Sequence, residues 1–263
     1  MQIPFLQVDA FADAPLTGNP AAVMPLDAWL PDATLQAIAN ENNVSETAFH
    51  VPWVGEDADF ELRWFTPTVE VALCGHATLA SGHMVLDADL ARTEVRFMTR
   101  KAGLLAVSRA AQGYRMALPA YAPSPSVDRS VADALGGAAI ETLSHARGYS
   151  VVTYASEADI HALHPDFATL KTMGDTLFIA TAPGATTDVV SRVFAPTAGI
   201  DEDPVTGSAH AVITPYWAAR LGRARFTAYQ ASARGGRMTC EAAGERVYLE
   251  GDCVTVIEGV FRL

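Results

Sequence analysis

The stretch FTPTVEVALCGHATLA, residues 65–80, is repeated in altered form as FAPTAGIDEDPVTGSAHAV, residues 194–212. The blocks FTPT and FAPT lie 129 residues apart, and the blocks CGHA and TGSA lie 132 residues apart. The second copy therefore has three extra residues, which we place within DEDP, residues 201–204. Both copies run from an extended Phe-x-Pro-Thr segment through a small-residue turn into an Ala-rich apolar run with helical spacing.

The length of this repeat indicates a duplicated domain. Solenoid repeats have periods of roughly 20–50 residues, so a period near 130 predicts two similar domains that face each other. Coincidence is the alternative, because short Gly-Ala matches arise easily in an Ala-rich chain. Two blocks in the same order at nearly the same offset favour duplication.

Each half of the sequence combines short strands with one apolar helix. The spacing of apolar residues predicts three helices, over residues 31–43, from Gly75 to about Leu86 and from Gly207 to Arg220. Alternating residues predict short strands around them, as in DFELRWF, residues 59–65. This is an α+β pattern rather than a regular βαβ alternation. The Pro-rich stretch 118–128 is the best linker and divides the chain into two domains.

The composition narrows the choice of partners. The chain has 263 residues, half of them hydrophobic, which is enough for two domains with their own cores. The net charge is −12, with 30 acidic against 18 basic residues, so phosphate-rich surfaces would be repelled. We therefore expect no nucleic-acid partner and no membrane partner. The sequence also lacks an apolar stretch of membrane-spanning length and a signal-peptide pattern at its start.

The cysteines and histidines predict neither a disulfide framework nor a metal centre. The three cysteines make an odd count without a C-x-x-C pair: Cys74, Cys240 and Cys253. This pattern favours a reducing, cytoplasmic location. The seven histidines show no H-E-x-x-H and no other recognised metal spacing, so we expect no structural metal.

Each repeat places a glycine and small residues at a predicted helix start. Backbone N–H groups at a helix start, together with the positive end of the helix dipole, suit a carboxylate or another anion. A small acid could therefore bridge the two helix starts across a common cleft. A pair of ordinary tight helix entries is the alternative reading of the same residues.

The two repeats differ in their reactive side chains. A two-base racemase needs matched thiols or carboxylates on opposite faces of a carbon atom, but Cys74 in the first repeat is matched by Thr206 in the second. A threonine hydroxyl is not a carbon base near neutral pH without strong activation. The chain offers His76, Asp203 and Ser208 instead, with Glu46 nearby in the N-terminal half.

Four blocks in order resemble the signatures of the PhzF-like proteins, the phenazine-biosynthesis isomerase family: GNPAAV (18–23), SETAF (45–49), RWFTPTVEVALCGHATLA (63–80) and DEDPVTGSAH (201–210). The resemblance covers most of the chain. It implies the fold of diaminopimelate epimerase, in which two similar domains each wrap a mixed sheet around a central helix and the active site lies between them. With the linker, it implies an N-terminal domain of 1–117 plus about 257–263, a C-terminal domain of 118–256, and a homodimer.

The resemblance also implies roles for individual residues. Glu46 of SETAF becomes the general acid/base, with His76 and Asp203 as its catalytic partners. The phenazine enzyme itself moves a proton between carbons of trans-2,3-dihydro-3-hydroxyanthranilate without a cofactor. We expect the small acid substrate to be bound by residues at the helix starts and beside them, namely Asn19, Gly75, Gly207 and Ser208.

The sequence departs from the family pattern near its C-terminus. The family usually carries Gln-Gly and then Gly-Arg-Pro-Ser, whereas YQASARGGRMTC, residues 229–240, has Ala231 after Gln230 and Met238-Thr239 in place of Pro-Ser. This leaves the substrate open. Two further functions stay as alternatives: a thiol-dependent racemase or epimerase that uses Cys74, and a non-catalytic protein that binds small acids or a partner on the same fold.

Overall fold

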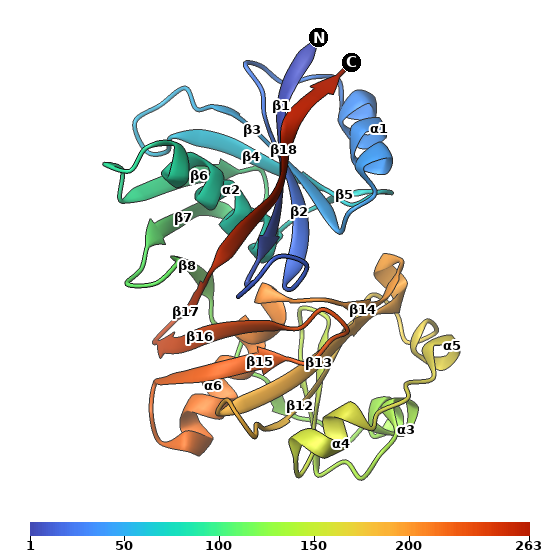
Figure 1. The fold of residues 1–263 in the computed structure, drawn as a ribbon. Helices are drawn as coiled ribbons and strands as arrows, with labels where there is room; N and C mark the ends of the chain where they lie inside the picture. Colours follow the sequence, from blue (N-terminus) through green and yellow to red (C-terminus); the bar gives the residue numbers. More distant parts are fainter. The chain divides into compact units, whose positions relative to one another are not determined.

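The computed structural model describes all 263 residues, which form two compact units. The first unit contains Met1–Ala117 and Glu250–Leu263, and the second contains Leu118–Leu249. The C-terminal segment that returns to the first unit thus begins earlier than residue 257. The reason is strand pairing, because β18 (Cys253–Arg262) lies antiparallel to β1 (Gln2–Ala10) over the full length of β1 (Figure 1).

The sheet of the first unit is mixed. It follows the order β18-β1-β2-β3-β4-β6-β7-β8, in which β2–β3 and β4–β6 are parallel and the other neighbours are antiparallel. The short β5 pairs with β4 and leads into the central helix. The remaining strands span Asn19–Pro25 (β2), Glu46–Pro52 (β3), Phe60–Phe65 (β4), Glu70–Val71 (β5), Glu94–Thr99 (β6), Gly103–Arg109 (β7) and Tyr114–Pro119 (β8).

The sheet of the second unit repeats this pairing. Its order is β9-β10-β11-β12-β13-β15-β16, with β14 on β13, and its parallel pairs are β11–β12 and β13–β15. These pairs hold the same places as β2–β3 and β4–β6, so the duplicated α+β fold expected from the sequence is confirmed. The strands span Ser124–Pro125 (β9), Glu141–His145 (β10), Tyr149–Thr153 (β11), Leu177–Pro183 (β12), Val189–Ala195 (β13), Ile200–Asp203 (β14), Arg225–Gln230 (β15), Gly236–Ala243 (β16) and Arg246–Gly251 (β17).

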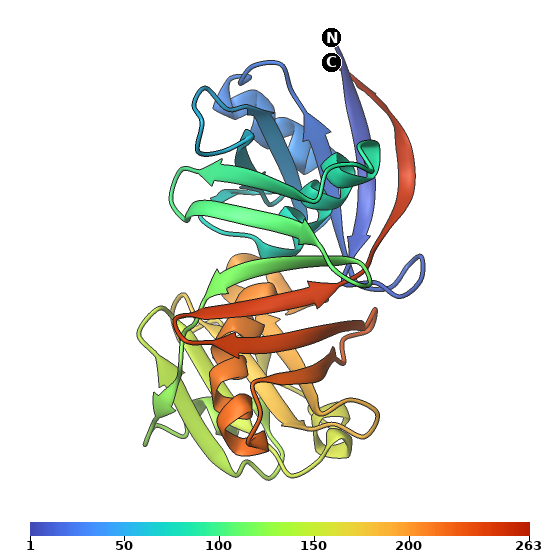
Figure 2. The ribbon, with the colours of Figure 1, turned by 90° about the vertical axis from the view of Figure 1, so that its left-hand side faces the viewer.

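Each unit has one long apolar helix against its sheet (Figures 1 and 2). Helix α2 (Gly75–Ala88) contacts β1, β2, β3, β6, β7 and β18, and ten of its 14 residues are buried. Close approach requires small residues, since a Cβ at Gly82 would lie 2.4 Å from Val107 of β7. Helix α6 (Gly207–Leu221) contacts β11 and β16 and buries eight of its 15 residues. None of the helices combines the length and the hydropathy needed to cross a membrane.

Smaller helices lie on the outside of each sheet. In the first unit, α1 (Asp32–Asn42) lies within the helix expected over residues 31–43 and buries Leu35, Ile38 and Ala39. The Pro-rich stretch 118–128 is not a free linker, because β9 within it pairs with β10 of the second unit. The other short helices are α3 (Ser130–Leu135), α4 (Glu157–His161), α5 (Phe167–Leu170) and the 3₁₀ turn η1 (Pro196–Ala198).

A buried arginine fixes the approach to the central helix of the first unit. Arg63 of β4, with a side chain only 1% exposed, donates from Nε and Nη2 to the two carboxylate oxygens of Glu70 at 2.8 and 2.9 Å. Asp32 lies 2.9 Å away on the same guanidinium, which also stacks 5.0 Å from the rings of Trp29 and Phe65.

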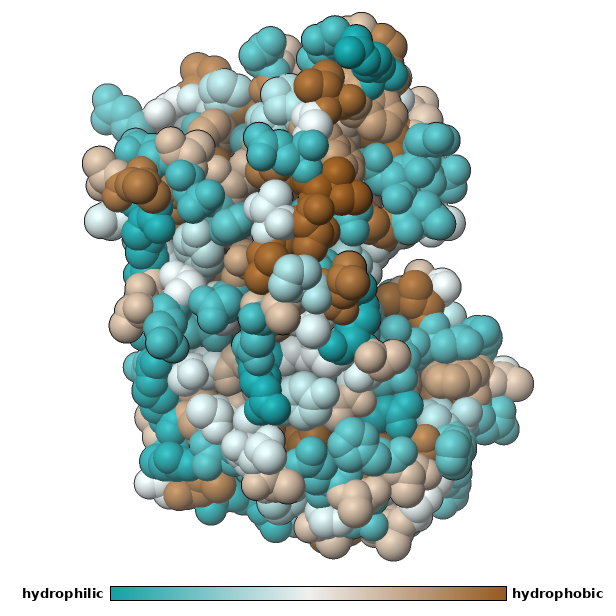
Figure 3. Space-filling view, in the orientation of Figure 1, coloured by the Kyte–Doolittle hydropathy of each residue, from teal (hydrophilic) through white to brown (hydrophobic).

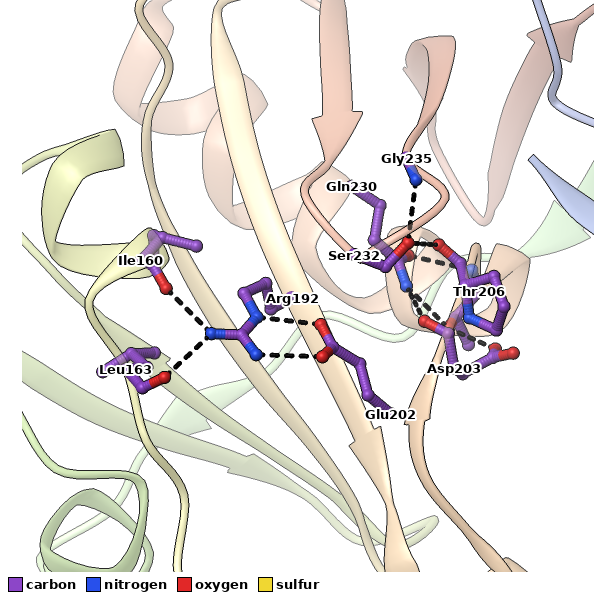
Figure 4. Close-up of polar contacts among 10 residues, drawn as sticks. Ile160, Leu163, Arg192, Glu202, Asp203, Thr206, Gln230, Ser232 and Gly235 are labelled. Carbon is purple, nitrogen blue, oxygen red and sulfur yellow. Dashed lines mark hydrogen bonds and ion pairs between the residues drawn. The ribbon is translucent and has the colours of Figure 1, made fainter. Parts of the chain in front are cut away.

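The second unit repeats this arginine bridge. Arg192 of β13 donates from Nε and Nη2 to Glu202 of β14, again at 2.8 and 2.9 Å, and lies 5.0 Å from the ring of Phe194 (Figure 4). Its Nη1 donates to the carbonyl oxygens of Ile160 and Leu163 at 3.2 and 3.0 Å (Figure 4). The duplication therefore extends from the strand order to individual side-chain geometry.

Strand pairing corrects the position of the three extra residues. Phe65 pairs with Glu70 and Trp64 with Val71 in the first unit, while Phe194 pairs with Glu202 and Val193 with Asp203 in the second. Glu202 is thus the counterpart of Glu70, and the extra residues lie before it, around η1, and not within DEDP as the sequence comparison suggested. Asp203 takes the place that Val71 holds in the first unit.

An apolar stripe follows the outer side of β18 (Figure 3). Ile257 and Val260 are each about half exposed on this strand, and Leu263 and Met1 are exposed beside the chain ends. The stripe is a surface feature of the first unit, and the homodimer expected from the sequence stays a prediction.

We expect Glu70→Ala to lower the free energy of unfolding by about 2 kcal/mol at neutral pH, because it leaves the buried Arg63 guanidinium without its bidentate partner. The hydrogen bond from Arg63 holds the pKa of Glu70 below its ordinary value, so this stabilisation is present at neutral pH and is lost as the pH falls through the folded-state pKa. Glu94→Ala, at an exposed position in β6, is the matched control and should change stability by less than about 0.5 kcal/mol. Urea unfolding followed by circular dichroism measures both variants, and equal stabilities would contradict the assigned role of the bridge.

Candidate active site

The two central helices begin in the same way. Cys74 and Thr206, the residues before Gly75 and Gly207, both have extended backbones, with φ −138°, ψ 112° and φ −118°, ψ 100°. Neither helix start has a side-chain cap. The first-turn N–H groups of a helix lack intrahelical partners and attract negative charge. Each unit therefore presents a helix start suited to an anionic group.

A side chain one turn into each helix holds the carbonyl of the preceding residue. In α2, the hydroxyl of Thr78 donates to the carbonyl oxygen of Cys74 at 2.6 Å. In α6, Nδ1 of His210 lies 2.9 Å from the carbonyl oxygen of Thr206. Burial lowers the pKa of His210 to about 4, so the ring is neutral and its Nδ1–H is the donor. Both contacts keep the entry residues extended.

In the first unit, the helix start brings His76 to a carboxylate. Glu46 is the first residue of β3, and His76 is the second residue of α2. Nε2 of His76 lies 3.0 Å from Oε2 of Glu46, and the two side chains are 4% and 17% exposed. The separation is that of an ion pair, although the two groups are not aligned as a hydrogen bond, and Oε2 is itself buried. The pair is therefore shielded from water but reachable from the Glu46 side.

Asn19 and Cys74 complete the surroundings of His76. Nδ2 of Asn19, the first residue of β2, lies 3.2 Å from Nδ1 of His76. Sγ of Cys74 lies 3.5 Å from Nδ1 and 4.0 Å from Nε2 of the same ring. Both Asn19 and Cys74 are buried. The imidazole is thus fixed on three sides by polar side chains.

These neighbours decide the charges in the cluster. Burial alone would lower the pKa of His76, but Cys74 and Glu46 more than offset burial and raise it well above its ordinary value. We attribute the rise to the Glu46 carboxylate, because Cys74 is a neutral thiol at neutral pH. Burial, with a further contribution from Glu46, raises the pKa of Cys74 to about 11. At neutral pH the cluster therefore holds an imidazolium and an uncharged thiol.

In the second unit, Asp203 and Gln230 organise the turn before α6 (Figure 4). The hydroxyl of Thr206 donates to Oδ2 of Asp203 at 2.5 Å. The fully buried amide of Gln230 accepts from the backbone N–H of Thr206 at 2.9 Å and donates to the backbone oxygen of Asp203 at 2.7 Å. Asp203 itself is only 9% exposed. Gln230 thus fixes both ends of the turn that carries Asp203.

The segment after Gln230 adds a second brace. The hydroxyl of Ser232 donates to the carbonyl oxygen of Pro204 at 2.8 Å and accepts from the N–H of Gly235 at 3.1 Å (Figure 4). Neither Gln230 nor Ser232 was predicted as a site residue. The only signal was the glutamine of the family's Gln-Gly pair, because the hydrogen bonds of Gln230 to residues more than 20 positions away leave no local spacing pattern.

The structure brings the predicted site residues together in two groups. Asn19, Glu46, Gly75 and His76 meet at the start of α2. Asp203, Gly207 and Ser208 lie at the start of α6, where Ser208 is half-buried. That the two groups serve one cleft stays a prediction.

Comparison with known proteins identifies the family and the fold. The family model of phenazine biosynthesis-like proteins matches residues 8–259. An uncharacterised isomerase of Pseudomonas aeruginosa is 49% identical over the whole of both chains. The crystal structure of a PhzF-family phenazine biosynthesis protein of Enterococcus faecalis superposes with a TM-score of 0.92 and 40% identity, covering all of both chains.

A more distant likeness concerns the fold alone. A hydroxyproline epimerase of Agrobacterium vitis matches 98% of this chain and 92% of its own length, with a TM-score of 0.62 and 11% identity. The duplicated architecture is thus that of the epimerases, while the close relatives are isomerases of the PhzF type. The chain is an isomerase, and it belongs to the family of phenazine biosynthesis-like proteins.

Proposed function

We propose that the chain is a cofactor-independent isomerase that moves a proton between carbons of a small carboxylic acid resembling trans-2,3-dihydro-3-hydroxyanthranilate. Glu46 acts as the single general acid/base. The observation that carries the proposal is the pair formed by a partly exposed carboxylate and a buried imidazolium, 3.0 Å apart, at the start of α2. A proton shift between carbons requires one base that takes a proton and returns it, together with a group that stabilises the charge in between.

Glu46 suits the role of base because of its position. A carboxylate accepts the carbon-bound proton, and the C–H electron pair enters the conjugated system of the substrate. The protonated Glu46 then returns a proton to a second carbon, so no net proton, electron or co-reactant is needed. Because the Glu46 side chain is 17% exposed, the carried proton can exchange with water before it is returned, and heavy water then leaves deuterium at carbon.

His76 supplies the fixed positive charge. Its contacts with Cys74 and Glu46 hold the ring in place, so the imidazolium need not reorganise as negative charge develops on the substrate. The helix starts supply the second element of recognition, because their N–H groups suit the carboxylate of the substrate. We assign Asp203, held by Thr206 and Gln230, to hydrogen bonding with the substrate's polar groups.

The thiol racemase is the weaker alternative. Its first base would have to be the thiolate of Cys74, whose pKa of about 11 leaves the thiol protonated near neutral pH. Its second base would occupy the place of Thr206, whose hydroxyl donates to Asp203 instead. A non-catalytic protein that only binds small acids or a partner would not need the Glu46 carboxylate as a base beside His76.

Glu46→Gln should lose at least about a hundredfold in turnover, because the amide keeps the shape of the side chain but accepts no proton. Purified protein is incubated in heavy water with trans-2,3-dihydro-3-hydroxyanthranilate and a panel of small unsaturated acids, and deuterium at carbon is followed by NMR. Glu41→Gln, at an exposed position of α1, is the matched control and should behave as the parent protein. Parent-like exchange in Glu46→Gln would refute the assignment.

The pH profile should reveal the charge on His76. Since its pKa is raised above the ordinary 6.5, the imidazolium persists at neutral pH and is lost only as the pH rises through the higher folded-state value. We therefore expect kcat/KM to fall on the alkaline side at a pH above 6.5. His76→Asn should abolish this limb along with most of the activity. An alkaline limb that stays in place in His76→Asn would show that another group causes it.

Cys74→Ala should retain at least about a tenth of the activity, because a protonated, buried thiol takes no part in the proton transfer. The measurement is the same exchange assay, with circular dichroism to establish that the variant is folded. A loss of about a thousandfold in a folded variant would favour the thiol racemase.

A further inference from the structure

The start of α2 gathers three side chains that are also metal ligands. Glu46, Cys74 and His76 each offer one ligand atom, and these atoms all lie within 4.8 Å of one another. Cys74 and His76 are buried, and Glu46 leaves the cluster reachable from solvent. The sequence did not predict this, because the three ligands come from the beginning of β3, the turn before α2 and the first turn of α2 rather than from one spaced motif.

We propose that Glu46, Cys74 and His76 form an inhibitory binding site for Zn²⁺. This inference goes beyond the proposed function in its binding step, which needs no catalytic role for Glu46. Only the inhibition rests on the proposed function.

Two of the three ligand separations in the cluster can be compared with those of a tetrahedral zinc site, and the third is within 4.8 Å. Zinc bonds of about 2.3 Å to sulfur and about 2.0–2.2 Å to nitrogen and oxygen place tetrahedral N and O ligands about 3.4 Å apart, and S and N ligands about 3.6 Å apart. Nε2 of His76 lies 3.0 Å from Oε2 of Glu46 and 4.0 Å from Sγ of Cys74. The Nε2–Oε2 separation needs only a few tenths of an ångström of adjustment. Sγ of Cys74 lies nearer to Nδ1, at 3.5 Å, so the Cys74 side chain must rotate toward the Nε2 side of the ring before the three atoms share one ion.

The donor set selects zinc over the common hard cations. One sulfur, one imidazole nitrogen and one carboxylate oxygen suit Zn²⁺, whereas Mg²⁺ and Ca²⁺ prefer oxygen ligands alone. Three protein ligands leave a fourth position for water or for a carboxylate of the substrate. The site would therefore leave one coordination position free, unlike a structural zinc site with four protein ligands.

Asn19 supports the imidazole from behind. Its side-chain amide lies 3.2 Å from Nδ1 of His76, the ring nitrogen remote from Glu46. Ligating histidines usually donate their other N–H to an oxygen, which fixes the ring and strengthens the ligand. Rotation of the Asn19 amide about its last bond would present its oxygen to Nδ1–H.

Zinc binding must displace protons from the cluster. The thiol proton of Cys74 and the Nε2 proton of His76 leave to the buffer as the S–Zn and N–Zn bonds form, and no oxidation is involved. The affinity should therefore rise with pH, by up to about a hundredfold per pH unit while both protons are released. Zinc on Glu46 occupies the oxygen that takes the substrate proton, so bound metal blocks turnover.

The test begins with binding alone, using Co²⁺ as the probe under reducing conditions. Bound Co²⁺ should give the absorption band of a cobalt–thiolate bond, and Zn²⁺ should remove this band by competition. Cys74→Ala should abolish the band and weaken zinc binding by at least about tenfold. Cys240→Ala, which removes a buried cysteine of the second unit, is the matched control and should keep the band.

The activity assay separates the two proposals. Zn²⁺ should inhibit the parent protein reversibly, with full recovery after chelation, and should inhibit more strongly at pH 8 than at pH 6.5. Cys74→Ala, compared with its own metal-free rate, should need at least about tenfold more Zn²⁺. Absence of the cobalt–thiolate band, or a band that survives in Cys74→Ala, would overturn the metal site. Zinc binding combined with full activity in Glu46→Gln would instead overturn the proposed function and leave the metal site standing.

Discussion

The bidentate pair between a strand arginine and a glutamate of the following hairpin is the constraint on which both central helices depend. Arg63–Glu70 and Arg192–Glu202 have the same two bond lengths, although the segments between their partners differ by three residues. Each pair fixes the chain at a glutamate that lies five residues before the helix begins. The extra residues of the second unit are absorbed before Glu202, so they leave the geometry of the helix entry unchanged.

Because both helix starts have the same backbone geometry, the two units can hold different reactive side chains at equivalent positions. In the first unit the entry residue is Cys74, and its neighbours are an imidazolium and a carboxylate. In the second unit the entry residue is Thr206, which donates to Asp203. A symmetric scaffold therefore holds an asymmetric set of groups. This asymmetry suits a single acid/base better than a matched pair, because only one unit places a carboxylate against a charged imidazole.

Much of the fold could be predicted from the sequence, because the repeated blocks and the periodicity of apolar residues can be seen in the sequence itself. The helices at residues 31–43 and after Gly75 and Gly207, and the α+β class, follow from spacing alone. The Glu46–His76 contact could be expected only from family resemblance, since it joins a strand to a helix. The position of the extra residues was wrong because a gap in a sequence comparison is free to slide, whereas strand pairing is not. Gln230 was missed because its partners lie far away in the sequence.

The pairing of β18 with β1 has a consequence for synthesis on the ribosome. β1 is translated before the whole second unit, and its partner β18 is translated after it. Until β18 has emerged, β1 therefore presents an unpaired edge that can pair with a wrong strand, while the second unit already has its full sequence. The second unit can therefore complete its fold before the first unit, although it comes later in the chain.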